Sequence, residues 1–479
     1  MQGARRIGRH RHRSLQSLVA KANVKYNNVI RNTPDEFGSG FQLKPHGRKR
    51  KQMEEETRRK KKRGNGHNTV SIFSLNDDIT IEILSRLPVK SLVRFKCVCK
   101  NWSFLIQEDA TFIGLHFKYS KARPSLLIIS NRIDFSTYNL MISDILFGGS
   151  CGAVSAAAFH TIQEIDYTTE HDMILKPING LIGFFGETRN DYGVCVCNPS
   201  TREITPWVES KLLSDLRKKD HEASIINCTL GYDPATKVYK VVGIWESRQP
   251  SYTVCEVLNV GDNEWRQIDE VPPYDLEIYG SYVYMNGSIY YNTYSVKVSC
   301  ANEKNMPKFL VAFDVGSEKF RTIRVPSYVF DRPYYKDTFM FYNVRLLELD
   351  DRLGLFIEHG NSGTLKLWLF DDERNKKNST SSWSEVSIEL PYTLDVHRNH
   401  VSFNPVPGTS QIILSSYPKT SDGKISDTTY YSYNWKNKSF NEIEISGIPC
   451  SVPSITSRSM LAIFSENLLP LRKQTSTKI

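Results

Sequence analysis

The segment Ser71–Ile106 has the sequence SIFSLNDDITIEILSRLPVKSLVRFKCVCKNWSFLI, and it is the one stretch of the chain with helical spacing of apolar residues. Its first half predicts a helix that begins after Asn76, a residue type that favours the N-cap position. At about 100° per residue, the apolar side chains of Ile79–Leu87 cover an arc of roughly 200°. Pro88 ends this helix, because proline lacks a backbone N–H and restricts the residue before it.

A second helical run follows, with apolar residues at Leu92, Phe95, Val98, Cys99 and Trp102. The two runs predict two or three short helices with more apolar surface than they can bury alone. A lone domain below about 40 residues is rarely stable without a metal, disulfides or a partner. We therefore expect a protein partner for this segment; the alternative is a helical hairpin that packs on its own chain.

Three blocks of this segment, Leu75–Ile79, Ile83–Leu92 and Arg94–Trp102, resemble an F-box of the plant type, and the match is long and ungapped. In that family the F-box docks on a Skp-type adaptor, which is held by the cullin and RING subunits of a ubiquitin ligase. The family usually carries proline where this chain has Asn76.

The resemblance implies two sets of residues in this segment. The expected adaptor contacts are Leu75, Ile79, Ile83, Leu84, Leu87, Pro88, Leu92 and Val98. The expected structural core of the F-box is formed by Phe95, Cys99 and Trp102.

The first 70 residues differ sharply in charge from the remainder. They hold 19 Lys/Arg and 5 Asp/Glu, whereas the whole 479-residue chain has a net charge of +10. Few large apolar residues and no periodicity predict a disordered leader. Two basic clusters in it resemble a bipartite nuclear import signal. They consist of Arg48, Lys49, Arg50 and Lys51, and of Arg58, Arg59, Lys60, Lys61, Lys62 and Arg63. Two alternatives are non-specific nucleic-acid binding and a solvated tail without function.

From about Ala122 the chain changes to short β-branched and aromatic segments separated by turn residues. One pattern recurs: an apolar strand, an Asn or Asp at a turn, and a bulky residue on the returning strand. The five turn anchors are Asn198, Asn259, Asp314, Asp371 and Asn434, at spacings of 61, 55, 57 and 63 residues. The bulky residues are Ile204, Trp265, Phe320, Trp383 and Phe440, which we expect to pack between neighbouring sheets. A weaker sixth copy is expected around Asp144.

Second hairpins lie between these anchors, among them Met285–Ser288, whose Asn-Gly pair is a tight-turn signal. Two hairpins per period of about 55–60 residues predict a four-stranded sheet per repeat, and radial stacking of such sheets gives a β-propeller. We therefore predict a mainly β chain with a small all-α module: a three-helix F-box followed by a kelch-like propeller of about six four-stranded blades. A pair of β-sandwiches or an irregular barrel is the alternative fold.

The repeats also resemble the F-box-associated interaction domain that follows plant F-boxes. The resemblance rests on Asn179–Ile182, Cys197–Arg202, Gly231–Pro234, Tyr239–Val242 and Phe313–Asp314. That family is kelch-like, and its members capture target proteins for ubiquitin transfer. The predicted domains are a basic leader over 1–70, the F-box over 71–115, the interaction domain over 120–465 and a tail over 466–479.

The sequence offers few candidates for catalysis or metal binding. His397 and His400 form H-x-x-H in a predicted loop without a third ligand, and the carboxylate pairs at 350–351 and 371–372 fall at turns. The nine cysteines include two C-x-C pairs but no zinc-ligand spacing, which is typical of reduced, buried thiols inside the cell. We expect no catalytic residue, cofactor, metal or membrane span. A propeller enzyme remains an alternative and would need polar groups that converge in the central channel.

The function predicted from the sequence is that of a substrate receptor of a Skp–cullin–F-box ubiquitin ligase. Its partners would be the Skp-type adaptor, the cullin and RING subunits reached through it, and an unidentified target protein. We expect it in the nucleus, the cytoplasm or both.

Overall fold

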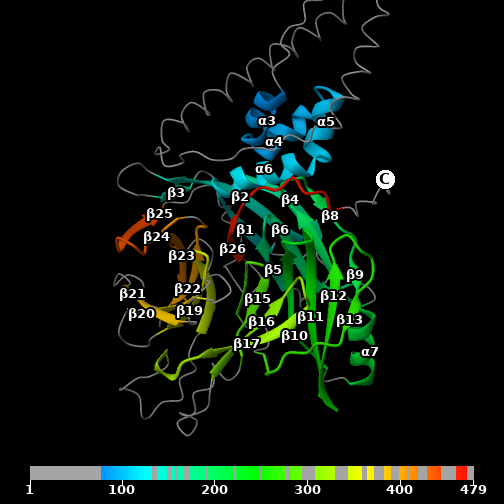
Figure 1. Cartoon of the computed structure of the whole chain (residues 1–479), viewed down its shortest axis with the longest axis vertical. Coiled ribbons are helices and arrows are strands. Elements are labelled where there is room, and N and C mark those ends of the chain that lie inside the picture. Colours follow the sequence, from blue (N-terminus) through cyan, green and yellow to red (C-terminus); the bar gives the residue numbers. More distant parts are fainter. Residues whose placement is uncertain are drawn as a thin grey trace, which may run out of the picture. The chain divides into compact units, whose positions relative to one another are not determined.

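A computed structural model gives the fold of this chain (Figure 1). It describes residues 77–131, 137–147, 154–156, 160–166, 173–188, 191–220, 223–248, 250–276, 281–293, 308–329, 344–358, 364–371, 382–389, 399–407, 409–418, 429–443 and 460–471. The chain divides into two compact units, Met1–Leu87 and Pro88–Ile479. None of the helices in these residues is long and apolar enough to cross a membrane.

The first unit contributes helix α3 (Asp77–Ser85), with Asp77 and Asp78 in its first turn, where negative charge suits the helix dipole. The second unit begins with three further helices, namely α4 (Val89–Phe95), α5 (Lys100–Gln107) and α6 (Ala110–Lys121). The described part of the F-box segment therefore holds four helices, so the prediction of three was wrong. The additional helix α6 begins where Oδ1 of Asp109 accepts hydrogen bonds from the backbone N–H groups of Thr111 and Phe112, both at 2.9 Å.

The described strands of the second unit form six antiparallel sheets. Sheet 1 has the order β26-β1-β2-β3 with β4 also paired to β2, and contains β1 (Ser125–Asn131), β2 (Thr137–Phe147), β3 (Val154–Ala156), β4 (His160–Asp166) and β26 (Met460–Phe464). Sheet 2 contains β5 (Met173–Ile178), β6 (Leu181–Glu187), β7 (Tyr192–Asn198), β8 (Glu203–Ile204) and β9 (Val208–Glu209).

The other four sheets each have four strands in sequence order. Sheet 3 contains β10 (Ser224–Asp233), β11 (Val238–Arg248), β12 (Ser251–Asn259) and β13 (Arg266–Ile268). Sheet 4 contains β14 (Tyr282–Met285), β15 (Ser288–Tyr291), β16 (Lys308–Asp314) and β17 (Lys319–Val325), followed by the 3₁₀ turn η1 (Ser327–Val329). Sheet 5 contains β18 (Val344–Leu349), β19 (Arg352–Glu358), β20 (Thr364–Asp371) and β21 (Ser382–Glu389). Sheet 6 contains β22 (Asn399–Pro405), β23 (Gln411–Pro418), β24 (Thr429–Asn434) and β25 (Ser439–Ile443).

The sheets follow one another in a ring. Strand β5 contacts β26 and β10, β10 contacts β15, β14 contacts β18, and β22 contacts both β18 and β26. Because these contacts run mostly between the first strands of successive sheets, those strands line the centre of the ring. The predicted mainly β class with a propeller is therefore confirmed. The four-stranded blade holds for four sheets, whereas the other two have five strands.

The turn anchors lie where the repeat predicts them, each at the end of the third strand of its sheet: Asn198, Asn259, Asp314, Asp371 and Asn434. The side chains of Asn198, Asn259, Asp314 and Asn434 close their turns locally, as short polar side chains do. Oδ1 of Asp314, for example, accepts a hydrogen bond from the backbone N–H of Ser317 at 2.8 Å. The fourth residue after the anchor takes a positive φ in three of these turns, at Arg202 (64°), Glu318 (57°) and Lys438 (57°).

Two bulky residues of the repeat join neighbouring sheets as predicted. Nε1 of Trp265, in sheet 3, donates to the carbonyl oxygen of Val208 in sheet 2 at 3.0 Å. Nε1 of Trp383, in sheet 5, donates to that of Arg324 in sheet 4 at 3.3 Å. The prediction was wrong for Ile204, which is 42% exposed because β8 is only two residues long.

Three other expectations need correction. Asp144 is no turn anchor, because it lies inside β2 opposite Ser125. His400 belongs to β22, opposite Tyr417, rather than to a loop. Residues 466–471 are not a tail, since Asn467 and Leu471 are 3% and 5% exposed. The helix α7 (Lys211–Lys219) was not expected at all.

Candidate functional site

Helix α3 presents an apolar pair to solvent. Ile79 is 49% exposed and Ile83 38%, and a spacing of four residues places both on one face of the helix. Leu84, on another face, is only 1% exposed. The pair is flanked by an ion pair between Arg86 and Glu82, one turn apart. Exposed isoleucines on adjacent turns form the kind of surface that a protein partner covers.

In the second unit, the predicted F-box residues separate into buried and exposed ones. Leu92 and Phe95 are 0% and 7% exposed, and the ring of Phe95 meets that of Trp102 edge-on at 5.7 Å. Val98 is 47% exposed, as a contact residue would be. Phe104, which the resemblance did not single out, is 62% exposed.

Two corrections follow from these positions. Leu84 and Leu92 were expected to contact the adaptor, but both are buried, so they offer no surface to a partner in this structure. Cys99 was expected in the core, but it is exposed, and its extended backbone (φ −158°) precedes α5 as the N-cap residue. Leu87 and Pro88 are half-buried. The adaptor contacts themselves stay a prediction.

Several predicted residues lie outside the described part of the chain. These are Leu75, the N-cap candidate Asn76, His397, Asp372 and both basic clusters between Arg48 and Arg63.

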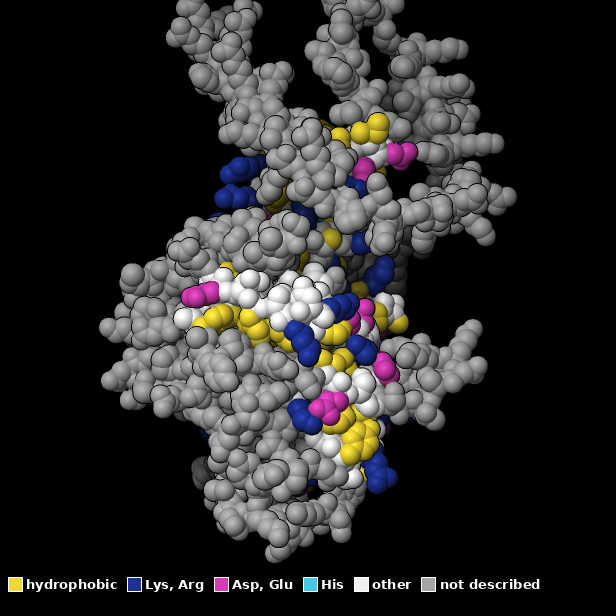
Figure 2. Space-filling model, turned by 90° about the vertical axis from the view of Figure 1, so that its left-hand side faces the viewer, with side chains coloured by type: hydrophobic (Ala, Val, Ile, Leu, Met, Phe, Trp, Pro, Cys, Tyr) yellow, Lys and Arg dark blue, Asp and Glu magenta, His cyan; other side chains and the backbone are white. Residues whose placement is uncertain are grey.

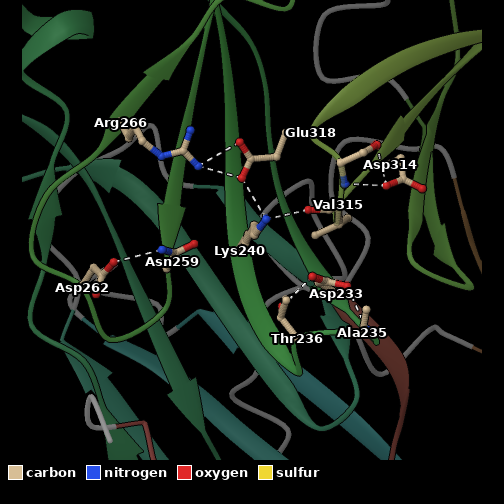
Figure 3. Close-up of polar contacts among 11 residues, drawn as sticks. Asp233, Ala235, Thr236, Lys240, Asn259, Asp262, Arg266, Asp314, Val315 and Glu318 are labelled. Carbon is tan, nitrogen blue, oxygen red and sulfur yellow. Dashed lines mark hydrogen bonds and ion pairs between the residues drawn. The ribbon is translucent and has the colours of Figure 1, made fainter. Parts of the chain in front are cut away.

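A charged cluster joins sheets 3 and 4 at the end where the anchor turns lie (Figure 3). Nζ of Lys240 donates to Oε1 of Glu318 at 2.8 Å and to the carbonyl oxygen of Val315 at 2.7 Å. Arg266 donates to both carboxylate oxygens of Glu318, at 2.7 and 2.8 Å. Burial acts to raise the pKa of Glu318, but the hydrogen bonds from Arg266 and Lys240 outweigh it and hold the pKa below its usual value. Every charge in this cluster is paired, so we read it as a clamp between sheets rather than a ligand site.

A second polar group converges in the centre of the ring. The backbone N–H of Lys176, in β5, donates to the hydroxyl of Tyr282 at 2.7 Å, and Nζ of Lys176 donates to the carbonyl oxygen of Tyr282. Tyr282 begins β14, two sheets away from β5, so this contact spans the middle of the ring. Burial and the nearby Arg345 of β18 lower the pKa of Lys176 to about 8.

Sequence reasoning missed this central group. Its members come from inner strands more than one hundred residues apart, as the contact between Lys176 and Tyr282 shows, and no local motif marks them. The available signal was the repeat of five anchors. Each anchor belongs to one sheet, and the first strands of the sheets meet at the axis of the ring.

The remaining candidates have structural roles. Asp350 and Asp351 form the turn between β18 and β19, with φ of 52° and 56°. Cys195 and Cys197 are buried on one face of β7 in the same apolar cluster, whereas Cys97 and Cys99 are exposed, contrary to the expectation of burial. Among the described residues no cluster of three His, Cys, Asp or Glu side chains could hold a metal ion.

Figure 2 bears on the nucleic-acid alternative. On the face it shows, the described Lys and Arg side chains stand singly or in small groups among hydrophobic and acidic ones. A nucleic-acid backbone is recognised by a continuous basic surface. The described residues on this face do not form one.

Comparison with known proteins finds two domain families that match this chain. Residues 72–112 match the F-box domain, and residues 150–468 match the F-box associated beta propeller domain. Two F-box proteins of Arabidopsis thaliana are each 28% identical to this chain, over 394 and 398 residues. The alignments cover 78% and 82% of this chain, and 89% of each relative.

An F-box/kelch-repeat protein of the same plant is 26% identical over 429 residues, covering 85% of this chain and 94% of the relative. Among solved structures, TolB from Acinetobacter baumannii is 10% identical, with a TM-score of 0.36 over 71% of this chain and 66% of TolB.

Proposed function

Because this chain belongs to the F-box associated beta propeller family, we propose that it is the substrate-recognition subunit of a Skp–cullin–F-box ubiquitin ligase. In this role the F-box binds the Skp-type adaptor and the propeller binds a target protein. The observation that carries the proposal is the pair of exposed isoleucines on α3, Ile79 and Ile83, inside a segment that matches the F-box.

The energetics of α3 support this role. Large apolar side chains left in water on one helix face contribute little to the fold of their own chain. Covering such side chains in an interface is favourable by roughly 25 cal/mol per Å² of apolar surface. Leu84 is buried, while Ile79 and Ile83 remain available to a partner.

The mechanism we propose is proximity rather than chemistry by this chain. One chain that binds the adaptor and the target at once raises the effective concentration of a target lysine near the ubiquitin carrier. The bond-forming steps belong to the other subunits of the ligase.

The test is adaptor binding by the full chain, measured by calorimetry with a purified Skp-type adaptor. The variant Ile79→Asp/Ile83→Asp should weaken binding at least about 30-fold, because apolar anchors at the centre of an interface each contribute on the order of 1–2 kcal/mol. The matched control is Ile204→Asp, an isoleucine of the propeller that is 42% exposed. No binding by the folded, unaltered chain would refute the proposal.

We also propose that the two basic clusters, Arg48–Lys51 and Arg58–Arg63, direct the chain to the nucleus. A fluorescent fusion of the full chain would locate it in plant cells. Replacing the basic residues of both clusters by glutamine should shift the fusion to the cytoplasm. An unchanged nuclear signal would rule out this role.

A further inference from the structure

Two cations lie on opposite sides of the ring, on strands that hydrogen bonds connect to the start of β14. Lys176 lies on β5, the first strand of sheet 2, and Arg345 lies on β18, the first strand of sheet 5. Burial, and after it the positive charge of Arg345, lowers the pKa of Lys176. Both side chains remain partly exposed, so solvent or a ligand can reach them.

Neither cation has a carboxylate partner among the described residues. Nζ of Lys176 donates to the carbonyl oxygen of Tyr282, and Nη1 of Arg345 donates to that of Val401 in β22. A carbonyl dipole offsets only part of the cost of holding a positive charge away from bulk water. The clamp at Glu318 shows the contrast, since one carboxylate there neutralises Lys240 and also pairs with Arg266.

Two neutral donors complete the group. Tyr282 is buried, with 6% of its surface exposed, and its hydroxyl oxygen accepts a hydrogen bond from the backbone N–H of Lys176, which leaves its own proton to donate. Oγ of Ser281 likewise accepts from the backbone N–H of Leu346 at 2.9 Å, which also places the start of β18 beside the start of β14. Two cations and two hydroxyl donors therefore gather without a negatively charged acceptor among the described residues.

Three members of the group lie at one end of the channel. Ser281 comes directly before β14, Tyr282 begins that strand, and Arg345 is the second residue of β18, whereas Lys176 is the fourth of the six residues of β5. Each of these first strands enters the ring from the end opposite the anchor turns, because successive strands in a sheet alternate in direction. The clamp and the anchor turns lie at the other end, so this group faces a separate mouth of the propeller.

We propose that Lys176, Ser281, Tyr282 and Arg345 form a binding site for an oxyanion, and that a target protein supplies it as an acidic side chain inserted into the channel. The second part rests on the proposed function. A carboxylate suits the group because it accepts several hydrogen bonds at once and cancels one of the two adjacent charges. The channel of a propeller is narrow, so a single side chain can enter it but the folded surface of a target protein cannot.

The test measures binding of a fluorescein-labelled hexaglutamate peptide to the full chain by anisotropy at low salt, with inorganic phosphate as a separate titrant. Lys176→Met and Arg345→Met remove a charge while keeping an apolar stem of similar length. Each should weaken peptide and phosphate binding by about tenfold or more, as the loss of a charge-assisted contact does. The control is Arg324→Met, an exposed arginine near the end of β17, which should change both affinities less than about twofold.

Three results would overturn the inference. Equal binding by all four proteins would exclude the site, and so would an absence of binding by the unaltered chain. Binding of phosphate without the peptide would contradict the acidic side chain as its occupant. Adaptor capture by the same preparations separates the two proposals: capture without peptide binding refutes the oxyanion site alone, and peptide binding without capture refutes the ligase role alone.

Discussion

Asn198 donates its side-chain amide to the C-terminal segment, to the carbonyl oxygens of Asn467 at 3.0 Å and of Leu469 at 2.9 Å. The same Asn198 closes its own turn, since Oδ1 accepts from the backbone N–H of Ser200 at 3.0 Å. Asn467 in turn donates from Nδ2 to the carbonyl oxygen of Asn179 at 2.7 Å. One repeat anchor thus fastens the chain end that follows β26, while β26 closes the ring by pairing with β1.

Replacing Asn198 by alanine should therefore cost more than the same change at an ordinary anchor. It leaves two buried carbonyl groups without donors and opens the turn, so we expect a loss of about 2–3 kcal/mol in the free energy of unfolding. Asn434→Ala is the control, because Asn434 bonds only its own turn, and we expect about 1 kcal/mol there. Urea denaturation of both variants measures the difference, and equal losses would show that the bonds from Asn198 to Asn467 and Leu469 add nothing.

Removing the last strand should prevent stable folding. A chain that ends at residue 459 lacks β26, the strand that pairs with β1 and contacts β5 and β22. An open ring exposes apolar edges of sheets 1 and 6, so we expect an aggregating protein without a cooperative thermal transition. A chain that ends at residue 471 keeps β26 and the segment after it that Asn198 binds, and it is the control. A sharp transition in the shorter chain would contradict closure by β26.

The clamp between sheets 3 and 4 gives a third prediction. Glu318→Gln leaves Lys240, whose side chain is 10% exposed, without its counter-charge. We expect a loss of about 2–3 kcal/mol, because a buried charge without a partner is costly. The matched control is Glu385→Gln, which breaks a pair with Lys366 that is 33% and 40% exposed and should cost below about 1 kcal/mol.

A double variant sharpens that test. Lys240→Met combined with Glu318→Gln removes the buried charge together with its partner, so it should be more stable than Glu318→Gln alone. Chemical denaturation at one pH and salt concentration compares all four proteins. A double variant less stable than the single one would mean that Lys240 stabilises the sheets without needing Glu318.

The raised pKa of Glu348 predicts that the stability of the folded chain depends on pH. Burial and the charge of Asp351 raise its pKa to about 7, although Lys121 acts in the opposite direction. Between about pH 4.5 and 7 the folded chain keeps a proton that the unfolded chain releases, so this group's contribution to stability is lost as the pH rises through 7. Glu348→Gln removes that cost and should stabilise the chain by about 2 kcal/mol at pH 8, with the gain vanishing near pH 4.5.

Thermal denaturation of Glu348→Gln across this pH range provides the measurement. Glu264→Gln, in a side chain that is 75% exposed, is the control and should show no such profile. A gain in stability that is the same at every pH would mean that the amide packs better and that ionisation has no part in it.

The sequence predicted the local features of the propeller well. Asn198 and Asp314 could be found because a turn anchor acts on its own neighbours, within three residues. Trp265 and Trp383 could be found because a large residue on the strand that returns from the anchor recurs from sheet to sheet. The start of α6 was also open to prediction, since Asp109 is an N-cap residue by type.

Long-range relations could not be predicted in the same way. The pairing of β26 with β1 depends on strands at opposite ends of the chain, and the contact of Lys176 with Tyr282 depends on the closure of the ring. The apolar arc of α3 covers more than half of the helix surface, so the sequence does not show which of its apolar side chains are buried. Only the structure shows that Leu84 is buried and that Ile79 is exposed.

Binding of a purified Skp-type adaptor to the full chain, beside Ile79→Asp/Ile83→Asp and Ile204→Asp, tests the central claim most directly. The account predicts tight one-to-one binding that survives Ile204→Asp and falls at least about 30-fold in the α3 variant. If the folded, unaltered chain fails to bind the adaptor, or if the α3 variant binds as tightly as the unaltered chain, the claim is contradicted.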